Sequence, residues 1–246
     1  MKANTCVYRR VMLIILLIGL VTLGTASPYA GSVGNGPAAP TQLRGSRGCW
    51  LSSGIEDSGR SSGLIWPSGV PSVDMAFQNE GLALVNVFGV SPRGFFFDDR
   101  SAPNAYATGE VVHPSGPDGT IVFGLALLQG ELARDGGIGL SVPAIMAHEF
   151  AHLVQFKRGV EIPTVQMELQ ADFMAGWYLG LRGRYVYTDV RPAFQAFFQI
   201  GDYDFNNPNH HGTPQQRLAA IQAGFSSSNL SFEQAFRRGL EFVRSR

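Results

Sequence analysis

The sequence predicts an α+β fold, with a small sheet in the N-terminal half and helices in the C-terminal half. Short runs rich in β-branched and aromatic residues lie between residues 81 and 128, and helical patterns fill the chain from Ser141 onward. Strands that come first and helices that follow them are typical of this class. The 246 residues, 45% of them hydrophobic, suffice for one domain with a real core and an additional terminal segment.

The first 26 residues have the pattern of a secretory signal. Lys2, Arg9 and Arg10 precede an apolar run over residues 11–23, and small residues follow at 24–26. We therefore expect residues 1–26 to be a signal peptide and the protein to be exported, either extracellular or periplasmic. The apolar run is shorter than the roughly 20 residues of a transmembrane helix. An N-terminal membrane anchor is the alternative.

Residues 27–71 are rich in Gly, Ser and Pro and show no sustained period, which predicts a flexible spacer. Trp50 and Trp66 could dock on the domain, but a loose arm is the simpler interpretation. Cys6 lies in the expected signal and leaves Cys49 alone, so we expect no internal disulfide. Residues 72–246 then form the expected domain.

Extended segments dominate the first part of this domain. A short helix is expected over residues 72–80, and strand-like runs follow over residues 81–90, 94–97 and 119–128, with a shorter extended piece over residues 103–107. These runs combine β-branched or aromatic residues with adjacent turn residues, as strands do.

Helices are expected in the remainder of the chain. Ser141 can cap a helix that ends at about residue 158, and Pro163 suits the first turn of a second helix, which ends near residue 183. A third helix follows over residues 189–200, and sequences typical of capping boxes open two more at Thr213 and Ser231.

The motif H-E-F-A-H at residues 148–152 has the spacing of a metal site. Residues four apart in an α-helix lie about 40° apart around the axis and about 6 Å along it. His148 and His152 therefore project from one side of a helix and can bind one zinc ion at about 2.0–2.1 Å. Glu149 can reach a zinc-bound water as the general base without being a ligand. Two surface histidines on an amphipathic helix are the alternative, which the apolar neighbours disfavour because polar groups in a buried helix need partners.

The next helix offers a third ligand. A catalytic zinc ion takes three protein ligands and leaves one position open. Glu168 is the best candidate, since a turn around residues 159–163 lets the second helix return over the first. Asp172 lies four residues later on the same helical face. Its carboxylate can accept the N–H on the far side of a liganding histidine and so fix that ring.

Together these motifs resemble those of gluzincin zinc metallopeptidases. H-E-F-A-H with E-L-Q-A-D at residues 168–172 is similar to the motifs of bacterial neutral zinc metallopeptidases and of the heat-shock protease and CAAX-prenyl-protease group. Residues 103–107 and 118–124 resemble the segment before the active-site edge strand of the latter group and that strand itself. H-G-T-P-Q-Q-R at residues 211–217 resembles the late H-x-T-P-x-x-R segment of both, and the similarity covers about residues 75–225.

The resemblance implies a zincin-like fold in which an edge strand of the small sheet runs along the active-site helix. It also implies an extended substrate that pairs with this strand near residues 121–128. The implied ion is one Zn²⁺ per chain, held by His148, His152 and Glu168. The chain departs from the integral-membrane members, because it has one apolar segment at most where they have several. Gln155 replaces a residue of the metzincin extension, which is therefore absent.

The roles of some polar residues after the second helix stay open. His211 can polarise the substrate carbonyl or stabilise an oxyanion, or it can be a loop residue that fixes the start of the next helix. His210 and Tyr203 are weaker candidates for the same role. Arg217 is expected to anchor its helix by an ion pair, with Asp172 or a main-chain carbonyl as partner.

We therefore expect a zinc-dependent metalloendopeptidase that hydrolyses protein or peptide substrates. The alternative is a catalytically silent domain that keeps zinc for stability, although a structural site has no need of the base Glu149. A formal net charge of zero without a basic patch gives no case for a nucleic-acid partner. Membrane contact is expected only if residues 1–26 are retained.

Overall fold

The computed structural model describes residues 48–50, 63–134, 139–183, 185, 187–203 and 210–245. The α+β class predicted from the sequence is confirmed. The expected signal peptide and most of the expected spacer lie outside the described residues. Among the helices that the structure describes, none is both long and apolar enough to cross a membrane. In chain order the elements are β1 (Gly48–Trp50), α3 (Pro71–Phe88), β2 (Arg93–Phe97), β3 (Ala105–Thr108), β4 (Thr120–Gly124), α4 (Leu125–Arg134), α5 (Ser141–Lys157), α6 (Thr164–Leu181), α7 (Tyr187–Gln199), α8 (Pro214–Phe225) and α9 (Phe232–Arg244).

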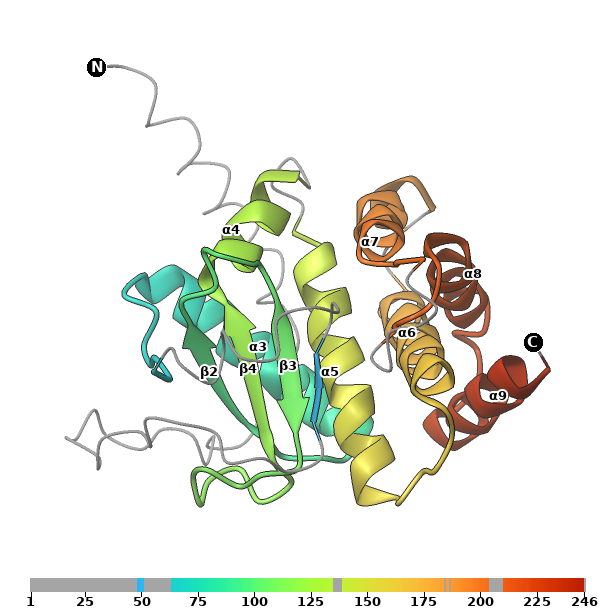
Figure 1. Ribbon diagram of the computed structural model, residues 1–246, viewed down its shortest axis with the longest axis horizontal. Helices are drawn as coiled ribbons and strands as arrows, with labels where there is room; N and C mark the ends of the chain where they lie inside the picture. Colours follow the sequence, from blue (N-terminus) through green and yellow to red (C-terminus); the bar gives the residue numbers. More distant parts are fainter. Residues whose placement is uncertain are drawn as a thin grey trace.

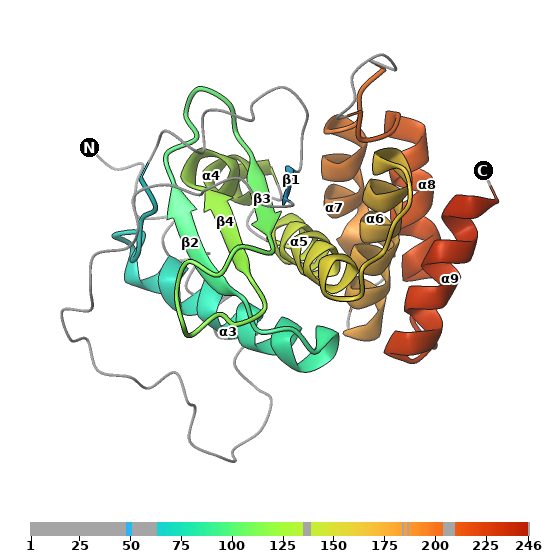
Figure 2. The same ribbon diagram turned by 60° about the horizontal axis from the view of Figure 1, so that its bottom comes forward.

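Helix α5 lies between the sheet and the C-terminal helices α6 to α9, and two views show the same order (Figures 1 and 2). The sheet has the strand order β1-β3-β4-β2, in which β3 is antiparallel to β1 and β4, and β2 is parallel to β4. Alternate residues of the strands, such as Phe96, Ile121 and Phe123, join the main apolar core together with α3 and α5. The helix that carries the H-E-F-A-H motif is therefore in the middle of the molecule.

The strand expected to bind substrate is not an edge strand. β4 pairs with β3 on one side and with β2 on the other, so its main-chain groups are used within the sheet. The extended run also ends earlier than expected, because α4 begins at Leu125. The expectation that substrate pairs with residues 121–128 is therefore wrong.

Residues 81–90 are largely helical, not extended. They continue α3, which runs from Pro71 to Phe88. The buried side chains of this helix are Phe77, Glu80, Leu84 and Phe88, which recur every three or four residues on one face. The apolar run at residues 82–88 resembles a strand because three of its seven residues are β-branched or aromatic, yet burial follows the helical period.

Part of the expected spacer is packed against the domain. Gly48–Trp50 forms β1 and pairs with β3. Ile65 exchanges two main-chain hydrogen bonds of 2.8 Å with Phe96, and the Trp66 ring stacks on the Phe96 ring with 5.6 Å between centroids. These residues of the expected spacer are therefore packed on the sheet and do not form a loose arm. Stacking on Phe96 removes apolar surface of the Trp66 ring from water, which stabilises this packing.

The C-terminal helices are held by close backbone packing and by their caps. A Cβ atom on Gly224 of α8 would lie 1.8 Å from the carbonyl oxygen of Phe173 in α6, so the two backbones touch there. The expected capping boxes are present at Thr213 and Ser231. The N-cap of α5 is Leu140, not Ser141 as expected. The contact of α6 with α8 brings Arg217 of α8 to the helix that carries the predicted third ligand.

Candidate metal centre

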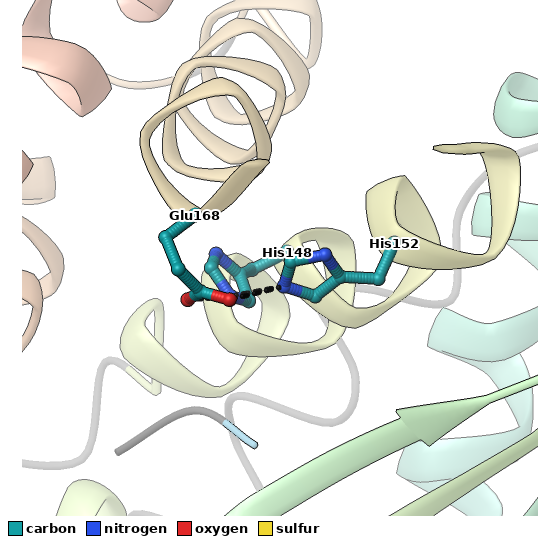
Figure 3. A group of neighbouring side chains, drawn as sticks. All are labelled: His148, His152 and Glu168. Atoms are coloured by element: carbon teal, nitrogen blue, oxygen red, sulfur yellow. Dashed lines mark hydrogen bonds and ion pairs between the residues drawn. The ribbon is translucent and has the colours of Figure 1, made fainter. Parts of the chain in front are cut away.

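Three predicted ligands meet between α5 and α6. Figure 3 shows the rings of His148 and His152 on one side of α5 and the Glu168 carboxylate reaching them from α6. The two histidine Nε2 atoms are 3.0 Å apart. Glu168 Oε2 lies 3.4 Å from Nε2 of His148, and Oε1 lies 3.3 Å from Nε2 of His152. This group, with donor atoms all within 4.8 Å of one another, could hold a metal ion.

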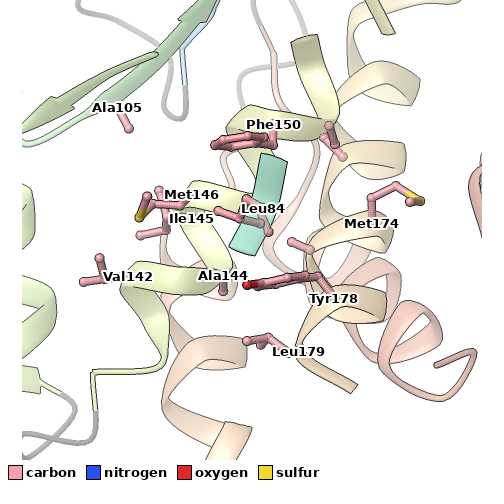
Figure 4. Packing of buried hydrophobic residues seen from close by; sticks show 14 of the residues in the cluster. Leu84, Ala105, Val142, Ala144, Ile145, Met146, Phe150, Met174, Tyr178 and Leu179 are labelled. Carbon is pink, nitrogen blue, oxygen red and sulfur yellow. The ribbon is translucent and has the colours of Figure 1, made fainter. Parts of the chain in front are cut away.

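Helix α5 is buried on all sides, which fixes the two histidines. Its residues are buried from Ser141 to Gln155. Ile145, Met146 and Phe150 lie in the main apolar core, with Leu84 of α3 and Tyr178 of α6 close by (Figure 4). A helix that is apolar on every side needs burial on every side. The polar side chains of the motif are therefore in the interior, where each needs a partner.

Asp172 lies where the sequence predicts it. Its Oδ1 atom is 2.8 Å from Nδ1 of His148, on the side of the ring away from the other ligands. Arg217 donates to the same carboxylate through Nε at 2.8 Å and through Nη2 at 2.7 Å. All three side chains are buried. The arginine thus holds the carboxylate, and the carboxylate orients the histidine, as is common around metal-binding histidines.

Glu168 is surrounded by cationic and hydrogen-bonding groups. His211 Nδ1 lies 2.9 Å from Glu168 Oε2. Burial alone would raise the pKa of Glu168, but the charges of His211 and His152 and hydrogen bonds with both ligand histidines outweigh it. They hold the pKa of Glu168 well below its ordinary value. Glu168 is therefore an anion at neutral pH, the form that binds a cation.

The pKa of His148 is raised in the metal-free protein. Burial and the neighbouring His152 disfavour its charged form, but Asp172 and Glu168 outweigh both and stabilise the imidazolium. A proton and a metal ion thus compete for Nε2 of His148.

Glu149 is the residue whose surroundings are the most unusual. Its side chain has no exposed area, and neither carboxylate oxygen has a hydrogen-bond partner within the described part of the chain. Burial raises its pKa from 4.5 to about 7, although the nearby His148 and His152 act in the opposite direction. An unpartnered buried carboxylate is costly, and it points to a group that the described residues do not supply.

His211, His210 and Tyr203 differ in their contacts with this centre. His211 is buried and contacts Glu168, whereas His210 is paired through Nδ1 with Asp202. The Asp202 carboxylate also accepts the main-chain N–H of His211 at 3.4 Å. Tyr203 is exposed and donates to the side chain of Gln215. Of these candidates, His211 is the one in contact with a predicted ligand.

Gln155 is a site residue that the sequence analysis did not assign. Its Oε1 atom lies 2.8 Å from Nδ1 of His152, and the side chain has no exposed area. The available signal was its spacing, because a residue three positions after His152 lies on the same helical face. Amide side chains are too common on helices for that spacing to single out a role.

Comparisons of this chain with protein-family models, with curated proteins and with solved structures each find no match.

Proposed function

We propose that the protein is a zinc-dependent metalloendopeptidase that holds one Zn²⁺ per chain on His148, His152 and Glu168 and uses Glu149 as general base. The observation that carries the proposal is the buried Glu149 carboxylate, which has no hydrogen-bond partner in the described residues and interacts electrostatically with all three potential ligands. A site that binds a metal ion for stability alone needs the three ligands but not this fourth group.

The donor atoms fit a zinc ion. Ligand atoms about 2.05 Å from a tetrahedral zinc ion lie about 3.3 Å from one another. The corresponding distances are 3.0 Å between the histidine nitrogens and 3.4 and 3.3 Å from these nitrogens to the Glu168 oxygens. Two imidazoles and one carboxylate also suit zinc in type, and three protein ligands are typical of catalytic sites.

The chain's own residues supply the acid–base chemistry. A zinc ion held here would supply Lewis acidity toward water and toward the carbonyl of the scissile peptide bond. Glu149 would accept the proton that the attacking water loses and then donate it to the nitrogen of the leaving amine. Burial raises the pKa of Glu149 and so favours its protonated form, which would let the side chain hold the proton between the two steps. Asp172 holds His148 with Nε2 toward the site.

We propose that His211 orients Glu168. Its Nδ1 atom already contacts Glu168 Oε2 at 2.9 Å, so stabilisation of an oxyanion would fall to the other ring nitrogen. The proposed substrate is a protein or peptide, and its binding position is not β4, which is paired on both sides. His148, Glu149 and Glu168 have no exposed area, so substrate entry requires the walls of the site to open.

Export is part of the proposal and depends on residues 1–26, which lie outside the described residues. Retention of that segment would make the protein membrane-anchored instead. Determination of the N-terminal sequence of the protein recovered from its native host distinguishes the two, since cleavage after the signal removes the first methionine and the apolar run.

The test is metal analysis combined with cleavage of an unstructured protein substrate. Wild-type protein should contain about one zinc ion per chain and cleave the substrate, and His148→Ala should lose both properties. Zinc at full occupancy with no cleavage of any peptide in a proteome-derived library would favour the catalytically silent domain. Full zinc content in His148→Ala would contradict the assignment of the ligands.

A further inference from the structure

Gln155 connects a predicted ligand to the helix that carries the third one. It lies near the end of α5, one turn after His152, and its side chain contacts α6. Gln155 Nε2 donates to the main-chain oxygen of Met167 at 2.9 Å and to Oε1 of Gln170 at 2.6 Å. Met167 is the residue immediately before Glu168. The amide therefore contacts His152 of α5 and two residues of α6, one of them directly before Glu168.

These contacts fix which end of the amide faces His152. A main-chain carbonyl oxygen can only accept a hydrogen bond, so the group next to Met167 must be the NH₂ end of Gln155. The carbonyl end then faces His152, with 2.8 Å between Oε1 and Nδ1. Since Oε1 can only accept, Nδ1 of His152 must carry a hydrogen atom.

We infer that Gln155 is a positioning residue that keeps the proton of His152 on Nδ1 and leaves Nε2 for the metal ion. Nε2 is the nitrogen that faces His148 at 3.0 Å and Glu168 at 3.3 Å. In a neutral imidazole only one nitrogen carries hydrogen, so fixing it on Nδ1 makes Nε2 the electron-pair donor. The same amide donates to the main-chain oxygen of Met167, directly before Glu168. It therefore also holds the two ligand-bearing helices in register.

The two ligand histidines are thus held by different chemistry. His148 is held by Asp172, an anion that Arg217 clamps with two hydrogen bonds. His152 is held by a neutral amide whose donor hydrogens are engaged by α6. A carboxylate in place of the Gln155 amide would bury a second negative charge, and the loss of its hydration would cost free energy. The neutral amide positions the His152 ring without that cost.

This inference rests on the proposed zinc site, but its first test needs no metal. In metal-free wild-type protein with ¹⁵N-labelled histidine, the two ring nitrogens of His152 are followed against pH by NMR, with His152→Asn as the assignment control. Nδ1 should stay protonated at every pH, and Nε2 should become the unprotonated nitrogen when the ring is neutral. An unprotonated Nδ1 in the neutral ring overturns the inference, whether or not the protein binds zinc.

The second test compares two variants at Gln155 with a matched exchange elsewhere. Gln155→Met keeps the length of the side chain and removes both ends of the amide, so Nδ1 should no longer be held protonated and zinc affinity should fall by about tenfold to a hundredfold. Gln155→Glu keeps an acceptor and should retain the Nδ1–H signature. The control, Gln195→Met, changes an exposed glutamine of α7 and should alter neither.

The outcomes separate the inference from the proposed function. Failure of wild-type protein to bind zinc contradicts the proposed function, while the metal-free NMR result still decides the role of Gln155. Zinc binding by wild type and by Gln155→Met with equal affinity, with the same His152 tautomer, contradicts the role of Gln155 and leaves the zinc site intact.

Discussion

Replacement of Glu149 by glutamine should stabilise the metal-free protein, and the gain should depend on pH. The side chain is fully buried and neither oxygen has a partner in the described residues. Burial raises its pKa from 4.5 to about 7. The folded protein therefore binds this proton more tightly than the unfolded chain does, so stability falls as pH rises from about 4.5 to about 7 and stays low above it.

The magnitude follows from these two pKa values. One pKa unit corresponds to about 1.4 kcal/mol. Integrated between pH 5 and pH 8, the wild-type protein should lose about 2–3 kcal/mol of its free energy of unfolding through Glu149 alone. Glu149→Gln carries no titrating group at this position and should not lose it. The stability of the variant relative to wild type should therefore be about 2–3 kcal/mol greater at pH 8 than at pH 5.

Urea denaturation of chelator-treated protein at the two pH values measures this difference directly, because the midpoint and slope yield the free energy of unfolding. Glu161→Gln, at an exposed carboxylate, controls for the exchange of glutamate for glutamine itself. A stability difference between Glu149→Gln and wild type that is the same at pH 5 and pH 8 would refute the reasoning, since it would mean that this carboxylate has a partner in the folded state.

Three further predictions concern the scaffold and are checked by chemical denaturation. Asp99→Ala should cost about 3 kcal/mol, because the buried carboxylate accepts main-chain N–H groups at the first turn of α4; an unchanged midpoint would contradict this. Gly224→Ala should cost about 1–3 kcal/mol or more, because the new methyl group would overpack the contact with α6. Its control Gly130→Ala, with open space around the new Cβ, should be neutral or stabilising by up to about 1 kcal/mol. Arg217→Met should cost about 3–5 kcal/mol by leaving the Asp172 carboxylate uncompensated, and adding Asp172→Asn should recover part of the loss.

The arrangement of the candidate metal centre could be predicted because it is mostly local. His148 and His152 are one helical turn apart, and any helix over these residues places them together. Glu168 and Asp172 follow the same rule on the next helix, and the turn between the helices is short. The zincin-like fold stays a prediction, since the confirmed part is the α+β class.

The errors lie where tertiary pairing decides the structure. Residues 81–90 are rich in residues that favour strands, yet Leu84 and Phe88 are buried on a helical face together with Phe77. The position of β4 inside the sheet depends on its pairing with β2, more than 20 residues earlier in the chain. Neither outcome follows from local propensity, which burial and pairing commonly override.

The role of Gln155 depends on contacts that a one-dimensional pattern does not contain. Its spacing places it near His152, but the orientation of the amide is set by Met167 and Gln170 on the neighbouring helix. The buried, unpartnered state of Glu149 is likewise visible only in three dimensions. It supports a functional interpretation of a motif whose sequence alone was compatible with two surface histidines.

The measurement that tests the central claim most directly is the rate of peptide-bond cleavage by wild-type protein and by Glu149→Gln at equal zinc content. The proposal predicts that both bind one zinc ion and that the variant cleaves at least about a hundredfold more slowly, because general-base catalysis contributes about 10²–10⁴ in rate. Equal rates at equal zinc content would contradict the assignment of Glu149 as the base and, with it, the proposed mechanism.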